Sequence, residues 1–274
     1  AIGHNALTKN TTGGSNIAIG RNASQENTTA SDNIAIGLQA LYNTSTGDKN
    51  VAMGREAMQA ATTVNKCVVI GYQAMYTHTG TGDERNVMVG YGAGYAETTG
   101  YNNTFIGSNA GGSVTTGKFC TAVGFEAANN STTGNHNISL GYRAYPSSNT
   151  AGNECTLGSD NISSLRCNDT SISSLSDRRD KTDIVDLPTG LNFLNTLRPV
   201  KFKWATRNGN IKDGKIRAGF IAQELQSAQT DCDYLDLVMD NNPDRLEAKQ
   251  EHLIPVLVKA IQELSAEVKR LKNG

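Results

Sequence analysis

Aromatic side chains are scarce in this chain, at 6% of 274 residues, and Trp occurs once. The five Cys include no CxxC pair, so we expect no disulfide framework and no metal site, and folding in a reducing cytoplasm fits this composition. No apolar run reaches the roughly 18 residues of a membrane helix, and the net charge of −1 gives no general attraction to nucleic acid. We therefore expect no cofactor, no nucleic-acid partner and no membrane insertion.

A repeat fills most of the chain instead. A Gly follows a mostly apolar triplet every 17 residues, with one spacing of 19 residues, and an Ala follows each of the first nine of these glycines by three positions. The repeat glycines are Gly3, Gly20, Gly37, Gly54, Gly71, Gly90, Gly107, Gly124, Gly141 and Gly158. The apolar residues three and one positions before each Gly alternate as in a β-strand, and the Gly permits a sharp bend after it.

This period predicts a parallel β-solenoid, because one unit cannot bury its own apolar face but stacked coils can. We expect the two apolar positions of each strand to form that face, and the small Ala to lie in a crowded contact. An Asn column four positions before Gly predicts a hydrogen-bonded ladder, with Cys67 and Cys120 as small buried members of the column. The two extra residues fall in "HTGTGDERN", which predicts a turn.

The repeats resemble the head repeats of trimeric autotransporter adhesins, with their AIGxxA units, and the shafts of phage tail fibres. This resemblance covers about residues 1–158 and implies three chains packed side by side in a rod. Since the chain opens in mid-repeat, we expect it to be the C-terminal piece of a longer polypeptide. Six Tyr are candidates either for stacking on a sugar or for packing over turns and between chains: Tyr42, Tyr72, Tyr76, Tyr91, Tyr95 and Tyr142.

A different composition follows the repeat. Residues 159–175 are rich in Ser and Asn and predict a junction with one or two last strands. They lead into "SDRRDK", in which Ser176 and Lys181 are five residues apart. A Ser hydroxyl needs a base to become a nucleophile, and a Lys can serve when burial leaves its amine neutral. The same residues also fit a helix N-cap with Lys181 on a solvated face, so the spacing alone leaves both interpretations open.

Three separate motifs carry a second resemblance: "SDRRDKTDIVDLPTGLNFLNTLRPVKFKW" at 176–204, "AGFIAQEL" at 218–225 and "EHLIPVLVKAIQEL" at 251–264. In order and spacing they resemble the C-terminal intramolecular chaperone auto-processing domain of phage endosialidases, neck appendages and L-shaped tail fibres. A related domain occurs in membrane-bound transcription factors of the myelin regulatory type.

That resemblance implies a Ser-Lys dyad of Ser176 and Lys181, which cuts the chain once, between Leu175 and Ser176. The sequence departs from the family pattern at Asp180, where relatives often carry an apolar residue, and an adjacent carboxylate tends to keep a Lys protonated. The charges of Asp177, Arg178 and Arg179 either position this loop or are simply solvated.

The end of the chain predicts a coiled coil over residues 252–272. Apolar residues spaced alternately three and four apart form an a/d seam: Ile254, Leu257, Ile261, Leu264, Val268 and Leu271. An amphipathic helix lying on its own domain is the other interpretation, and the resemblance of the repeats to trimeric rods favours a trimeric bundle.

The expected architecture is mainly β: a solenoid shaft at 1–158, a junction at 159–175, and a smaller α/β chaperone domain at 176–274. We expect a homotrimeric phage tail fibre or tailspike, folded in the host cytoplasm, carried on the virion and attached to a host cell-surface glycan or protein receptor. The main alternative is a trimeric bacterial surface adhesin whose trimerisation domain is not cleaved. A glycan depolymerase would need paired carboxylates on the solenoid face, and acids there are sparse.

Overall fold

The computed structural model describes residues 1–159, 162, 164–166, 175–205 and 214–274. The chain divides into two compact units, Ala1–Ser159 and Asp160–Gly274, which we describe separately. The finer boundaries at 158 and 176 stay a prediction, and the predicted junction at 159–175 lies mostly outside the described residues.

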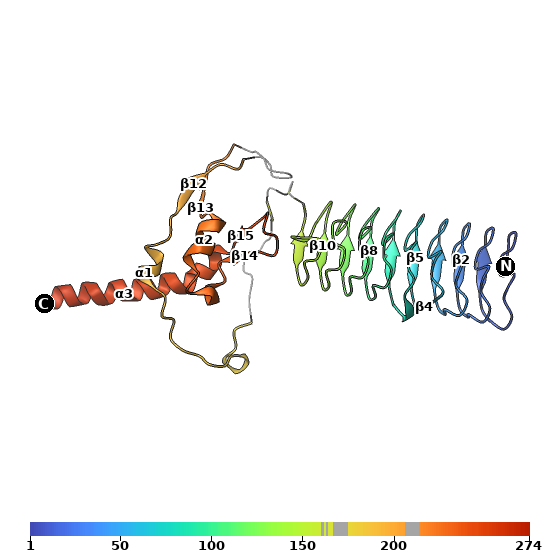
Figure 1. Cartoon of the computed structure of the whole chain (residues 1–274), viewed down its shortest axis with the longest axis horizontal. Coiled ribbons are helices and arrows are strands. Elements are labelled where there is room, and N and C mark those ends of the chain that lie inside the picture. Colours follow the sequence, from blue (N-terminus) through green and yellow to red (C-terminus); the bar gives the residue numbers. More distant parts are fainter. Residues whose placement is uncertain (160–161, 163, 167–174, 206–213) are drawn as a thin grey trace. The chain divides into compact units, whose positions relative to one another are not determined.

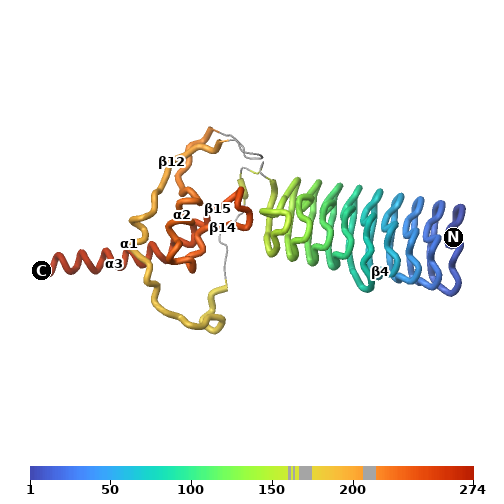
Figure 2. The backbone as a smooth tube through the Cα atoms, viewed as in Figure 1, coloured from blue at the N-terminus to red at the C-terminus, as the bar shows by residue number. Residues whose placement is uncertain are grey.

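The first unit is a parallel β-solenoid, as the repeat predicts, and Figure 2 shows its successive coils. Its main sheet has nine parallel strands, one per coil: β1 (Ile17–Ile19), β2 (Ile34–Ile36), β3 (Val51–Met53), β5 (Val68–Ile70), β7 (Val87–Val89), β8 (Thr104–Ile106), β9 (Thr121–Val123), β10 (Ile138–Leu140) and β11 (Cys155–Leu157). Neighbouring strands pair in the register of the repeat, so that Ile17 lies beside Ile34 and Ile34 beside Val51. An isolated bridge joins Ile2 to Ile19 in the same direction.

The inward face of these strands is the reverse of the one expected. The middle residue of each triplet points into the coil and is buried, from Ala18 in β1 to Phe105 in β8. The flanking apolar residues point outward, and Ile17 and Ile19 remain 48% and 39% exposed. The expectation that stacking within one chain buries the two apolar columns is therefore wrong. Side chains alternate across a strand, so only the middle column points inward, and the largest of its members, Phe105, fits because it packs against Gly111, where a Cβ would lie 2.4 Å from the ring.

The Gly and Ala columns set the corner after each strand. Gly54 has φ +136°, and a Cβ built on it would lie 2.3 Å from the carbonyl oxygen of Gly71 in the next coil. A side chain is thus excluded both by the backbone conformation and by the close approach of the next coil. The Ala three residues later is fully buried in every coil from Ala23 to Ala144.

The predicted Asn ladder is present, but it runs from side chain to backbone. The Oδ1 atom of Asn50 accepts a hydrogen bond of 3.0 Å from the backbone N–H of Cys67, in the next coil. Its Nδ2 donates to the carbonyl of Val64 at 2.7 Å. The column therefore satisfies buried backbone groups at the corners that the strands leave unpaired.

The 19-residue coil differs from the turn that its sequence predicts. It carries β6 (Thr81–Asp83), which pairs in parallel with β4 (Thr63–Asn65) in a separate two-stranded sheet. The segment with the two extra residues thus contains a short strand, which pairs with a strand of the preceding 17-residue coil.

The second unit is a small α/β domain. Its elements are η1 (Arg178–Asp180), α1 (Leu191–Leu194), β12 (Val200–Phe202), β13 (Arg217–Gly219), α2 (Ala222–Ala228), η2 (Asp233–Leu235), β14 (Val238–Met239), β15 (Glu247–Ala248), η3 (Gln250–His252) and α3 (Leu253–Asn273) (Figure 1). Strands β12 and β13 pair antiparallel, as do β14 and β15. The core gathers buried side chains such as Leu225, Leu237, Leu253 and Val256, and α1 packs against α3.

Candidate self-processing site

The predicted pair of Ser176 and Lys181 meets across a tight turn. The Nζ atom of Lys181 donates a hydrogen bond of 2.6 Å to the Oγ atom of Ser176. Between them η1 reverses the chain, with the backbone N–H of Lys181 donating to the carbonyl of Arg178 at 3.2 Å. A five-residue spacing therefore brings the two functional groups together because a 3-10 turn fills the interval.

Asp177 and Arg179 hold this turn. Asp177 is its N-cap, and its Oδ1 accepts from the backbone N–H of Arg179 at 2.8 Å. The Arg179 guanidinium also pairs with both carboxylate oxygens, at 2.6 Å from Nη2 to Oδ2. Hydrogen bonding to Arg179 lowers the pKa of Asp177 below its ordinary value. The Arg178 side chain makes no hydrogen bond or ion pair with any residue that the structure describes.

The site is open to solvent in a single chain. Ser176 and Lys181 are exposed, and the Leu175 side chain is 98% exposed. Asp180 also points to solvent, and within the described part of the chain it forms no ion pair with Lys181. The geometry of a Ser-Lys pair is therefore present without the burial that would favour a neutral amine.

The predicted seam of α3 is also open. Its six apolar residues are between 46% and 66% exposed: Ile254, Leu257, Ile261, Leu264, Val268 and Leu271. Another face of the helix packs on its own unit through Leu253, Val256 and Ala260. Glu263, on that side, accepts a 2.8 Å hydrogen bond from the backbone N–H of Leu191 at the start of α1.

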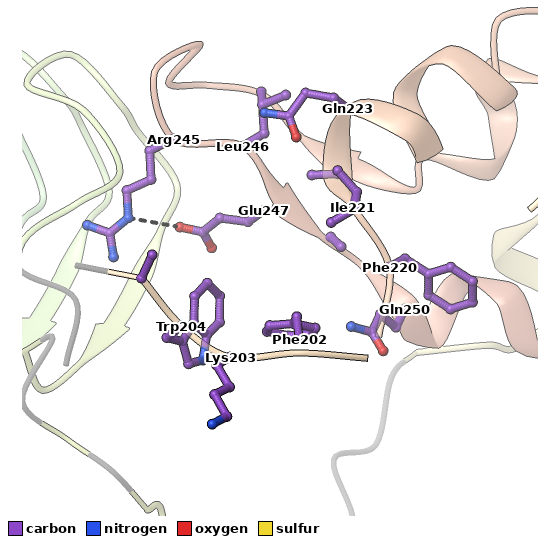
Figure 3. A pocket seen from close by; sticks show the side chains of 13 residues that line it. Phe202, Lys203, Trp204, Phe220, Ile221, Gln223, Arg245, Leu246, Glu247 and Gln250 are labelled. Atoms are coloured by element: carbon purple, nitrogen blue, oxygen red, sulfur yellow. Dashed lines mark ion pairs between the residues drawn. The ribbon is translucent and has the colours of Figure 1, made fainter. Parts of the chain in front are cut away.

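The sequence analysis did not identify an apolar cavity of about 720 Å³ beside β12 and β15. Figure 3 shows Phe202, Trp204 and Phe220 among its lining side chains, with Arg245 paired to Glu247 at 3.9 Å. The rings of Phe202 and Trp204 meet edge to face at 5.3 Å between centroids. The alternating apolar residues of "RPVKFKW" were the available signal, because they place both rings on one side of the strand.

Part of the second unit matches a known protein family. Residues 176–234 match the peptidase S74 family, described as chaperone of endosialidase. The match begins at Ser176 and spans the turn, α1, the β12–β13 pair and α2. This family is a self-cleaving chaperone domain, and together with the β-solenoid it fits the C-terminal region of a phage tail fibre or spike. No curated protein and no solved structure matches the chain.

The described residues contain neither a membrane-spanning helix nor a metal-binding group. Among them, no helix is both long and apolar enough to cross a membrane. Nor does the described part of the chain contain a group of three or more His, Cys, Asp or Glu side chains that could hold a metal ion.

Proposed function

We propose that the second unit trimerises, guides the folding of the solenoid shaft, and then releases itself by one cut between Leu175 and Ser176. The contact of 2.6 Å between Lys181 Nζ and Ser176 Oγ carries this proposal. The family match begins at the same Ser, which supports the assignment.

The chemistry follows from the two groups in contact. The neutral amine of Lys181 takes the Ser176 hydroxyl proton, and Oγ attacks the carbonyl carbon of Leu175. The C–N bond then breaks, the Ser176 nitrogen receives the proton from Lys181, and Leu175 is left esterified to Oγ. Water hydrolyses this ester and leaves a carboxylate at Leu175 and a free N-terminal Ser176.

Assembly is the step that starts this chemistry in our proposal. A solvated Lys is an ammonium and cannot accept the hydroxyl proton, whereas desolvation disfavours the charged form. Lys181 is exposed in the single chain, so packing against neighbouring protomers is what would bury it. The cut would thereby be delayed until three chains have come together.

Two unpartnered apolar surfaces support a homotrimer. One is the outward face of the solenoid sheet, where Ile17, Ile70, Ile106 and Ile138 are each more than a third exposed. The other is the a/d seam of α3. Exposed apolar stripes of this length mark surfaces that bind other protein chains, and a coiled coil would hold three solenoids in register while they wind.

Release of the second unit would increase the kinetic stability of the finished shaft. A long parallel solenoid has non-local pairing and folds slowly, so a trimerising domain raises the effective concentration of its strands. Once the rod has formed, removing that domain makes unfolding kinetically hard to reverse. The shaft would then serve host attachment on the virion.

An intact-mass measurement and a denaturing gel test the cut directly. We expect freshly expressed wild-type protein to give fragments 1–175 and 176–274, and Ser176→Ala and Lys181→Ala to remain whole at 29.1 kDa. Ser227→Ala and Lys201→Ala, which change the same residue types elsewhere in the unit, are matched controls and should still be cut. A wild-type protein that stays whole would reject self-cleavage and favour a permanently attached trimerisation domain, as in the adhesin alternative.

A further inference from the structure

A column of rings runs along the outside of the shaft. We define the aromatic column as the residues that directly follow the repeat glycines in six successive coils: Arg55, Tyr72, Tyr91, Ser108, Phe125 and Tyr142. Tyr72 and Tyr91 stack with centroids 5.2 Å apart and planes 6° apart. Phe125 and Tyr142 stack likewise, at 5.6 Å and 10°. Four of the six coils thus contribute a ring, and these rings stack in two pairs.

A guanidinium lies close to the last ring at each end of the aromatic column. The Arg55 guanidinium lies 5.6 Å from the centre of the Tyr72 ring, and the Arg143 guanidinium lies 5.2 Å from that of Tyr142. Such contacts are favourable because a cation is attracted to the face of an aromatic ring. Within the described part of the chain, the faces of Tyr91 and Phe125 that turn towards the Ser108 coil have neither an aromatic nor a cationic partner.

Ser108 lies in the coil between Tyr91 and Phe125. Strands β7, β8 and β9 pair in repeat register, so Tyr91, Ser108 and Phe125 occupy equivalent positions in three consecutive coils. Two coil steps of about 4.8 Å put the Tyr91 and Phe125 rings about 10 Å apart. Tyr91 is 58% exposed and Phe125 is 43% exposed. The aromatic column thus lacks one ring at its centre, between two solvent-accessible ring faces.

The gap has the thickness of one six-membered ring. A ring placed midway lies about 5 Å from each neighbour, within the separation of stacked rings, about 4.5–7 Å between centroids. Polar groups lie beside it: the Asn109 side chain makes no hydrogen bond to a described residue, and Glu126 pairs with Arg143 at 2.6 Å. A ring with apolar faces and a hydroxyl rim matches this setting, since orientation in binding sites comes from a few polar groups.

We propose that the gap at Ser108 binds one pyranose unit of a glycan, held between the rings of Tyr91 and Phe125. This inference rests on the attachment role proposed for the shaft, and it narrows the receptor from a glycan or protein to a sugar chain. Asn109 and Glu126 would meet the sugar hydroxyls. Each protomer would carry one such site, at the Ser108 coil.

Filling the gap is the sharpest test. The full-length protein is titrated with maltohexaose, cellohexaose, N-acetylchitotetraose and a bacterial lipopolysaccharide core oligosaccharide, and binding is followed by saturation-transfer NMR and calorimetry. We expect the wild type to bind at least one sugar with a millimolar or lower Kd. Ser108→Tyr should weaken that binding about tenfold or more and raise the Tm, because it completes the stack. Tyr91→Ala should weaken binding by a similar factor.

Matched variants separate this from general damage. Ser108→Ala leaves the gap open and should bind as the wild type does. Tyr95→Ala removes a ring from the other stack, formed by Tyr76 and Tyr95 at 5.4 Å, and should also leave binding unchanged. Unchanged binding in Ser108→Tyr, or no wild-type binding to any of these sugars at millimolar concentration, would overturn the proposal.

A tyrosinamide titration distinguishes a sugar ligand from an aromatic side chain of a protein. Binding of tyrosinamide that is lost in Ser108→Tyr, with no sugar binding, would assign the gap to an aromatic side chain of a protein and overturn the sugar assignment. The sugar titration measures binding to the shaft, whereas the denaturing gel measures cleavage between Leu175 and Ser176. A negative sugar titration would therefore not bear on self-cleavage, and an uncut wild-type protein would not bear on sugar binding.

Discussion

The least expected residues of the shaft are three buried ionisable ones in its 19-residue coil and the coil that follows. The His78 ring is fully buried, with its Nδ1 3.6 Å from Glu97 and its Nε2 4.0 Å from Glu84. Neither ring nitrogen has a hydrogen-bond partner among the residues that the structure describes. Burial raises the pKa of Glu84 to about 7, raises the pKa of Glu97 well above its ordinary value, and lowers the pKa of His78 to about 4. In the folded state each group therefore favours its neutral form.

This cluster predicts a pH-dependent stability of the shaft. Because the folded pKa of Glu84 lies above its ordinary value of 4.5, its contribution is complete below pH 4.5 and is lost as the pH rises through 7. Glu84→Gln should remove this loss, so that the variant has a higher Tm than the wild type at pH 8 and a similar Tm at pH 5. The opposite contribution of His78 is lost as the pH falls from 6.5 towards 4.

Thermal unfolding followed by circular dichroism between pH 5 and pH 8 measures this difference. Glu26→Gln is the control, because Glu26 lies on the surface and pairs only with Lys9 among the described residues. Its difference from the wild type should not vary with pH in the same way. Parallel pH profiles of Glu84→Gln and the wild type would show that the pKa of the buried Glu84 carboxyl is not raised.

For the elements, the period in the sequence was sufficient to predict the strands and their parallel stacking. It could not tell which face of a strand points inward, since alternation defines two faces and the choice depends on the width of the coil. Ala18 points inward, and so does the much larger Phe105, which fits because Gly111 lies against its ring, so the interior is filled by several columns together and no single column reveals the inward face. The corners were also hidden, because most coils place residues other than Gly, such as Gln39 and Leu41, at positive φ, and only two coils carry Gly at these positions (Gly92, Gly94 and Gly111).

The candidate site was also predicted only in part from the sequence. The motif made Ser176 and Lys181 candidates, but the spacing alone did not show that they meet. Their contact depends on the 3-10 turn capped by Asp177, a local feature that the sequence permitted equally as a helix start. The cluster around His78 could not be predicted, because its residues come from different positions of two adjacent coils.

A repeat glycine tests the corner argument. Gly54→Ala would place a Cβ 2.3 Å from the Gly71 carbonyl oxygen at φ +136°, so both a clash and backbone strain oppose it. We expect a loss of about 3 kcal/mol or more in unfolding free energy, or a failure to fold. Gly14→Ala is the control, since no atom lies within 4 Å of its added Cβ. Chemical denaturation of both variants measures the difference, and equal stability of the two would contradict the stacking constraint.

Across the whole molecule, each unit covers one apolar surface within the chain and leaves another open. The solenoid buries its middle column and exposes the flanking ones, while α3 buries Leu253 and Val256 and exposes its a/d seam. The association of several copies, as we propose, would account for both open surfaces in one event. The seam is the easier of the two to break, because it is a single helix face.

Leu264→Asp tests that association. A charge in the a/d seam must be desolvated when helices pack, so we expect this variant to dissociate to monomers and to abolish the cut at Leu175. Ala266→Asp adds the same charge two residues later, at a position that points away from the seam, and should leave a trimer. Light scattering coupled to size-exclusion chromatography measures the mass, and circular dichroism checks that both variants fold. A trimeric Leu264→Asp would place the trimer contacts elsewhere, whereas a monomer that still cuts itself would separate cleavage from assembly.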